Sequence, residues 1–249
     1  MTALFMARVP DGIIASADGA FYDHEGKLAG IATKLILMPA HDCIISLQGP
    51  YFFHPELRVR LHQVQGGFDG ILNLIVETMR AIHGDYANEY GFSRAFSLLI
   101  GGYSAARDRW ETYWINSEPY EEGSEHEPYE AWELTPAYAT AWVPGYSAGA
   151  AISAGLDPEK PLNAQGMDST EIAIRIVAAG RCEPIPIHGD VEHGCCQVGG
   201  FIQVARLGRD EASTVIVHRW PDAIGERMSP TNGDLLPSLG GATDHPPGR

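Results

Sequence analysis

Basic residues are scarce in this 249-residue chain: 17 lysines and arginines stand against 32 aspartates and glutamates, a formal net charge of −15. A nucleic-acid-binding protein needs a basic stripe to neutralise phosphates, and this composition leaves no surplus to build one. Long apolar runs are missing too, since none reaches the roughly 18–20 residues that span a bilayer. We therefore expect neither a nucleic-acid partner nor a membrane partner.

Cysteine is also rare, with four residues in the whole chain. Two of them, Cys195 and Cys196, are adjacent, which is a poor geometry for a mutual disulfide, so we expect no disulfide framework. The N-terminal stretch MTALFMAR lacks a basic region followed by an apolar one, so it does not read as a signal peptide. We expect a mature chain that begins at or near Met1 and stays in the reducing cytoplasm.

Apolar residues are plentiful at 45%, with five tryptophans, ten tyrosines and eight phenylalanines, so a sizeable core can be buried. The length suits one large domain or two small ones, and we expect a single domain over residues 1–220. From Pro221 onward Pro, Gly, Ser and Asp dominate. We therefore expect residues 221–249 to form a flexible tail without a core.

Hydrophobic patterning predicts strands, a helix, strands, a second helix and further strands. The first helix covers about residues 67–90, with an apolar stripe of Ile71, Leu74, Ile75, Met79 and Ile82. The second opens at Asp168, where Asp168 and Glu171 fit a capping box, and Gly180 supplies a stop. The predicted strands cover residues 3–8, 12–17, 34–38, 43–47, 95–103, 110–116, 138–143, 197–207 and 213–219. Because turn sequences such as Pro-Asp-Gly link them as hairpins, we expect an α+β fold with antiparallel sheets and helices outside.

Acidic side chains are concentrated between Glu118 and Glu133, a segment with seven glutamates, two prolines and no lysine or arginine. Such charge density is typical of a solvated loop. The carboxylates also lack the alternating ligand positions of a calcium loop. We interpret residues 118–133 as a surface insertion that accounts for much of the net charge.

Thr2 follows the initiator methionine and is small enough for methionine aminopeptidase to expose it. A freed N-terminal threonine combines a nucleophilic hydroxyl with an α-amine whose pKa of about 7.7–8.0 suits a general base. The amine needs a nearby cation to hold its pKa down and an anion to orient that cation. Asp18 and Lys34, sixteen and thirty-two residues after Thr2, are candidates for these roles.

At these residues the chain resembles the proteasome β-subunit and HslV family of N-terminal nucleophile (Ntn) hydrolases. Thr2, Asp18 and Lys34 keep the family's spacing, and DGIIASADG (residues 11–19) is similar to its DGVVLAAD strand. Further similar segments follow in the same order over residues 2–219: SLLIGGY (97–103), the helix opening at residue 168, and GGFIQV (199–204). The resemblance implies a four-layer αββα sandwich of two antiparallel sheets between helices.

The same resemblance implies a catalytic group of Thr2, Asp18, Lys34, Gly49 and Ser147. Gly49 would supply the oxyanion N–H and Ser147 would be the supporting serine, each one residue out of register with the family. Activity would be cleavage of peptide or other amide bonds, with no cofactor and no metal. The resemblance also implies a ring-like homo-oligomer and a protein or peptide substrate, and leaves an ATPase partner open.

Two supporting positions depart from the family pattern. Where the family has an aspartate and, three residues later, a serine before the Gly-Gly pair, this chain has Cys195 and Val198. A catalytically inactive ring or scaffold subunit is therefore the alternative interpretation.

Two further patterns leave other chemistry open. Residues 145–149 read G-x-S-x-G, the nucleophile elbow of α/β-hydrolases, for which Asp190 and His218 are the available partners of Ser147. The segment His188–Cys196 gathers zinc-type ligands without a C-x₂-C pair, and loop polarity is the simpler explanation. Its members are His188, Asp190, Glu192, His193, Cys195 and Cys196.

Overall fold

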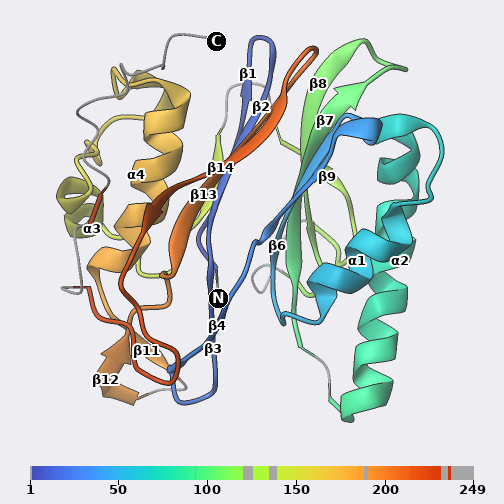
Figure 1. Cartoon of the computed structure of the whole chain (residues 1–249). Coiled ribbons are helices and arrows are strands. Elements are labelled where there is room, and N and C mark those ends of the chain that lie inside the picture. The colour runs from blue at the N-terminus through green and yellow to red at the C-terminus, as the bar shows by residue number, and fades with distance from the viewer. Residues whose placement is uncertain are drawn as a thin grey trace, which may run out of the picture.

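Two five-stranded antiparallel sheets make up most of the molecule (Figure 1). The computed structural model describes residues 2–92, 94–119, 126–134, 139–187, 190–230 and 235–236, with backbone alone for 185–187 and 190–195. The first sheet has the order β10-β1-β2-β13-β14. Its strands are β1 (Leu4–Val9), β2 (Gly12–Asp18), β10 (Thr140–Trp142), β13 (Phe201–Gly208) and β14 (Ala212–Arg219). The expected antiparallel sheet and its opening hairpin, in which Val9 pairs with Gly12, are confirmed.

The second sheet has the order β5-β6-β7-β8-β9 and is also antiparallel throughout. Its strands are β5 (Leu35–Met38), β6 (Cys43–Gln48), β7 (Ser97–Ser104), β8 (Arg109–Asn116) and β9 (Trp132–Glu133). Two short hairpins stand outside the sheets, β3 (Ala20–Tyr22) with β4 (Leu28–Ile31), and β11 (Ile185–Ile187) with β12 (Asp190–Cys195). Neither hairpin was predicted, because each strand is too short to show a clear alternation.

Helices lie along both sheets, with α3 and α4 beside the first and α1 and α2 beside the second (Figure 1). The four α-helices are α1 (Phe53–Leu61), α2 (Gly67–Tyr90), α3 (Ala148–Ser153) and α4 (Ser169–Cys182). Two 3₁₀ turns, η1 (Pro39–His41) and η2 (Leu162–Ala164), complete the described elements. None of the helices in the described ranges is long and apolar enough to cross a membrane.

Strand β1 shows how the sequence makes the core. Phe5 and Ala7 join a cluster with the α3–α4 side of the first sheet, while Leu4 and Met6 join a cluster between the two sheets. Because successive side chains of a strand point to opposite faces, a strand buried on both faces reads as a continuous apolar run. The Leu-Phe-Met-Ala run at the N-terminus is therefore the signature of a central strand.

Helix α2 has the predicted bounds, but one member of its predicted stripe is wrong. Ile71, Ile75, Met79 and Ile82 are fully buried against the second sheet, whereas Leu74 is 43% exposed. From Ile71 the buried residues follow at spacings of four, four and three positions. Leu74, one position before Ile75, therefore lies on a different face of the helix. The buried face also includes Phe68 and Tyr86.

Helix α4 begins as predicted and ends later than predicted. The Asp168 carboxylate accepts hydrogen bonds from the backbone N–H groups of Thr170 and Glu171, so the N-cap is confirmed. The Glu171 side chain instead pairs with Arg175. Gly180 does not stop the helix, which runs to Cys182. A Cβ on Gly180 would lie 2.6 Å from Val143 Cγ1, so this glycine permits close packing.

The segment after residue 118 is partly ordered against the body where the structure describes it. Glu133 forms a bidentate pair with Arg109, and β9 adds an edge strand to the second sheet. Tyr129 packs against the core cluster of α2. The described part of this segment is therefore anchored as well as acidic, and the interpretation of residues 118–133 as an insertion stays a prediction.

Candidate functional site

A cavity of about 770 Å³ lies beside Thr2 and carries the strongest claim to a functional site. Thr2 and Gly49 both line it, and aromatic side chains form much of the remaining wall. These are Phe21, Tyr22, Tyr51, Tyr86, Phe96 and Trp142. Thr2 thus lies next to a space large enough for a small molecule or for a side chain of a peptide.

Strand pairing brings Thr2 next to Asp18. Strands β1 and β2 are antiparallel with Leu4 opposite Ala17, so Ala3 lies opposite Asp18. The Ala3 N–H donates to Asp18 Oδ1 at 3.0 Å, and the Asp18 N–H donates to the Ala3 carbonyl at 3.3 Å. Thr2 itself is 3% exposed. The hairpin therefore ties the backbone next to the candidate nucleophile to a buried carboxylate.

Lys34 completes a buried ion pair. Its Nζ lies 2.8 Å from Asp18 Oδ1, and neither side chain is exposed. The second oxygen, Asp18 Oδ2, accepts the N–H groups of Ala20 at 3.1 Å and Gly199 at 3.3 Å. Four donors from four separate segments thus converge on one carboxylate, which fixes its orientation.

The environment of Lys34 favours release of its proton. Burial lowers the pKa of the Lys34 ammonium from its ordinary value, and the charge of Asp18 opposes this without cancelling it. The ammonium also lies over the Phe21 ring, 4.9 Å from its centroid. Lys34 is therefore a desolvated side chain that Asp18 holds in one place, and its action on the Thr2 amine stays a prediction.

Gly49 lies where the backbone needs a glycine. Its φ is +145°, and a Cβ there would lie 2.5 Å from Phe96 Cβ. The residue follows β6 and lines the cavity together with Thr2. The prediction that its N–H serves as the oxyanion donor remains a prediction.

Ser147 caps helix α3, and its place in the catalytic group stays a prediction. Its Oγ accepts the Ala150 N–H at 3.0 Å as the N-cap of α3 and donates to Glu183 Oε1 at 2.6 Å. It is not one of the residues that line the cavity beside Thr2. The described strand pairs are all antiparallel, which does not fit the parallel strand that an α/β-hydrolase elbow needs.

Two residues beside the site, His54 and Gln197, escaped prediction from the sequence. His54 is 6% exposed, its ring contacts Phe21, and its Nε2 has no hydrogen-bond partner among the described residues. Burial, with a smaller contribution from the charge of Lys34, lowers the pKa of His54 to about 4. Gln197 lines the cavity and accepts a hydrogen bond from the Tyr22 hydroxyl at 2.9 Å. The only sequence signal was a polar Gln197 beside an apolar strand.

The two positions that departed from the family pattern can be placed in part. Val198 is fully buried and belongs to the apolar cluster beneath α4. The side chain of Cys195 lies outside the described part of the chain. Most of the His188–Cys196 cluster lies there as well, and no group of three or more metal-type ligands occurs among the residues that the structure describes.

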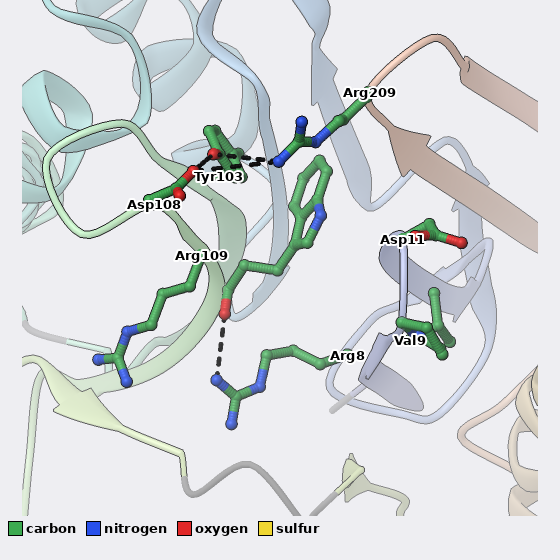
Figure 2. A pocket seen from close by; sticks show the side chains of 9 residues that line it. Arg8, Val9, Asp11, Tyr103, Asp108, Arg109 and Arg209 are labelled. Carbon is green, nitrogen blue, oxygen red and sulfur yellow. Dashed lines mark hydrogen bonds and ion pairs between the residues drawn. The ribbon is translucent and has the colours of Figure 1, made fainter.

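A second cavity, of about 670 Å³, lies at the opposite end of β1 around the β1–β2 turn (Figure 2). Three arginines line it. Arg8 donates to the Trp110 carbonyl, Arg209 contacts the Tyr103 hydroxyl, and Arg109 pairs with carboxylates of its own sheet. Their charges are directed at protein partners, so this cavity does not rival the one beside Thr2.

Comparison with solved structures shows what the fold resembles. The chain is similar to Anbu (ancestral beta-subunit) from Yersinia bercovieri, with a TM-score of 0.57 and 14% identity over 87% of each chain. It is equally similar to an Anbu (Gly-1) mutant from Hyphomicrobium sp. strain MC1, with a TM-score of 0.57 and 13% identity over 88% of this chain and 87% of that one. At this level of identity the likeness shows the fold alone.

No protein-family model matches the chain, and no curated protein matches it. The assignment to the proteasome β-subunit and HslV family is therefore wrong as made from the sequence. The short motifs on which it was based do not by themselves show a family. What stands is a likeness in fold to Anbu (ancestral beta-subunit).

Proposed function

We propose that the protein is a proteasome-like hydrolase that cleaves peptide or other amide bonds with Thr2, once Met1 has been removed. The observation that carries the proposal is the buried Asp18–Lys34 pair, joined to the backbone beside Thr2 at the wall of a 770 Å³ cavity. A buried ion pair without a function tends to add little stability over apolar packing. Its position next to the backbone beside Thr2 supports a chemical role for it.

In the proposed reaction, Thr2 Oγ attacks the amide carbonyl while the freed Thr2 amine takes the hydroxyl proton. The N–H of Gly49 stabilises the resulting oxyanion. Lys34 holds the pKa of the amine down through like charge, and Asp18 holds Lys34 in place. The amine then protonates the leaving nitrogen, and water hydrolyses the ester formed on Thr2.

The broader proposal follows from the same likeness. The two sheets and their helices are proposed to be a four-layer Ntn-hydrolase sandwich over residues 1–220. The active form is proposed to be a ring-like homo-oligomer in the cytoplasm that acts on protein or peptide substrates, with an ATPase partner left open. The aromatic walls of the cavity support a preference for apolar side chains next to the cleaved bond.

The test is hydrolysis of a set of fluorogenic peptides, preceded by intact mass measurement of the N-terminus. We expect Met1 to be absent and activity to depend on the hydroxyl, so that Thr2→Ala is inactive while Thr2→Ser retains activity. Ser213→Ala, which removes an exposed hydroxyl that bonds to Glu211, serves as the matched control and should retain full activity. Hydrolysis by Thr2→Ala at the native rate would overturn the proposal.

A second function, an inactive ring or scaffold subunit, is favoured by one observation. Val198 is a fully buried apolar residue at a position where the family resemblance puts a supporting serine. Under this alternative the purified chain assembles, as native mass spectrometry would show, but retains Met1 or hydrolyses none of the peptides. Assembly together with Thr2-dependent turnover would exclude it.

A further inference from the structure

A second buried ion pair lies behind the candidate site. Arg181 of α4 is fully buried and forms a bidentate ion pair with Asp222. Its Nη2 lies 2.7 Å from Oδ1, and its Nη1 lies 3.0 Å from Oδ2. The Asp222 side chain is 1% exposed. The guanidinium also lies over the Trp220 ring, 4.7 Å from its centroid. Such paired geometry is specific to arginine and fixes both partners.

This pair holds the segment from Val198 to Gly200 from one side. Arg181 Nη1 donates to the Val198 carbonyl at 3.0 Å, and Asp222 Oδ2 accepts the Gly200 N–H at 2.8 Å. A Cβ on Gly199 would lie 2.6 Å from Asp222 Oδ2. The segment is therefore pressed against the ion pair with no room for a side chain at Gly199.

The same segment contacts the candidate site from its other side. The Gly199 N–H donates to Asp18 Oδ2 at 3.3 Å, and the Gly199 carbonyl accepts the Gly19 N–H at 3.1 Å. Asp18 in turn bonds to Lys34 and to the backbone beside Thr2. An unbroken chain of buried polar contacts thus runs from Asp222 through two glycines to Asp18 and Lys34.

We propose that Arg181 and Asp222 are positioning residues that fix the Val198–Gly200 segment. The Gly199 N–H then orients Asp18, and Asp18 orients Lys34 for chemistry at Thr2. The proposal rests on the proposed function and deepens it. Asp222 lies in the part of the chain expected to be a tail, so residues just past 220 contribute to the site. Their effect on the site passes through Gly200 and Gly199 to Asp18.

The experiment exploits the fact that the chain has only three lysines, Lys27, Lys34 and Lys160. Nitrogen-15 NMR of selectively labelled lysine side chains, followed across a pH titration, reports on Lys34 directly. We expect Asp222→Asn to move the Lys34 signal and to lower the pKa of Lys34 further, because a displaced Asp18 carboxylate offsets the burial of the ammonium less. The exposed Lys160, which lies away from this network, should not change.

Glu171→Gln is the matched control. It removes the carboxylate partner of another arginine on the same helix, Arg175, without touching residues 198–200. We expect this variant to leave the Lys34 titration unchanged. Loss of the Asp222 charge leaves the buried Arg181 unpaired and can prevent folding. Arg181→Lys is therefore measured in parallel, because it keeps the cation and loses the bidentate contact. It should shift the pKa of Lys34 in the same direction.

Peptide hydrolysis supplies the second readout. Misplacement of a catalytic group by about 1 Å can cost on the order of 100-fold in rate, so we expect kcat of a folded variant to fall at least tenfold with KM little changed. A folded Asp222→Asn or Arg181→Lys protein with native Lys34 titration would overturn the inference. If the native protein shows no Thr2-dependent turnover while the Lys34 coupling is present, the proposed function fails and the positioning network stands.

Discussion

Replacing Asp18 with asparagine tests the physical basis of the candidate site without any assumption about its activity. The carboxylate neutralises Lys34 and accepts N–H groups from Ala3, Ala20 and Gly199. An asparagine has one acceptor oxygen in place of two, so its amide group must face at least one of these donors. Lys34 meanwhile stays fully buried without an anion.

The size of the effect follows from the cost of keeping Lys34 neutral. An ordinary lysine pKa lies about 3.4 units above pH 7, and each unit corresponds to about 1.36 kcal/mol, so an uncharged Lys34 costs about 4–5 kcal/mol. Removing one partner of a buried pair typically costs about 3–5 kcal/mol, in agreement. Against a total stability of about 5–15 kcal/mol, this is a large loss.

The pH dependence gives the prediction its sign. In the native protein burial already lowers the pKa of Lys34 in the folded state, and loss of Asp18 lowers it further. Between the folded and unfolded pKa values the unfolded state binds more protons, so the free energy of unfolding rises with pH. The free energy of unfolding rises more steeply with pH in Asp18→Asn than in the native protein. The stability gap between native protein and Asp18→Asn should therefore narrow from pH 7 to pH 10.

Urea unfolding at several pH values, followed by tryptophan fluorescence, measures this gap directly. Lys34→Met is the comparison variant, because it leaves the three backbone donors on Asp18 and should be the less damaging change at pH 7. A loss below about 1 kcal/mol for Asp18→Asn at pH 7, or a gap that does not narrow on raising the pH, would refute the reasoning.

Three further predictions concern single residues around the site. Ser147→Ala removes the N-cap of α3 and should lower the free energy of unfolding by about 1 kcal/mol in urea. Gly49→Ala forces a side chain into a positive-φ position against Phe96 and should lower stability by about 1–3 kcal/mol and abolish peptide turnover, with Gly30→Ala, which has open space, as control. The pKa of His54 is lowered to about 4, so the unfolded state binds the extra proton between pH 6.5 and 4, and native stability should fall by up to about 3 kcal/mol over that range. In His54→Gln the free energy of unfolding, measured from pH 6.5 to pH 4, should fall less than in the native protein. An equal fall would show that other groups cause it.

Much of the candidate site could be anticipated because it depends on a hairpin. Once residues 4–9 and 12–18 pair as antiparallel strands, Ala3 must lie opposite Asp18, and this follows from the turn alone. Lys34 could be proposed only by resemblance, and the structure brings its side chain to the same carboxylate. That resemblance also carried an error, since short motifs led to a family assignment that the comparisons do not support.

His54, Arg181 and Asp222 could not be anticipated in the same way. Each is buried by elements far apart in the chain, and no periodic pattern marks them. Helix α1, which carries His54, buries Phe53, Leu57 and Leu61 at a spacing of four residues, and this short stripe does not mark His54. Gly180 was misread as a stop because a packing glycine and a terminating glycine look alike in a sequence.

The sequence by itself determined the antiparallel strands and the two long helices, because these follow from local periodicity and turn residues. It also placed a threonine, a candidate nucleophile, directly after Met1. The tertiary structure alone decided that four donors meet on Asp18, that Gly199 joins them, and that Asp222 supports that glycine from beyond the expected domain end. Contacts between distant segments depend on how sheets and helices pack, and the cost of burying their charges is defined only once water has been excluded.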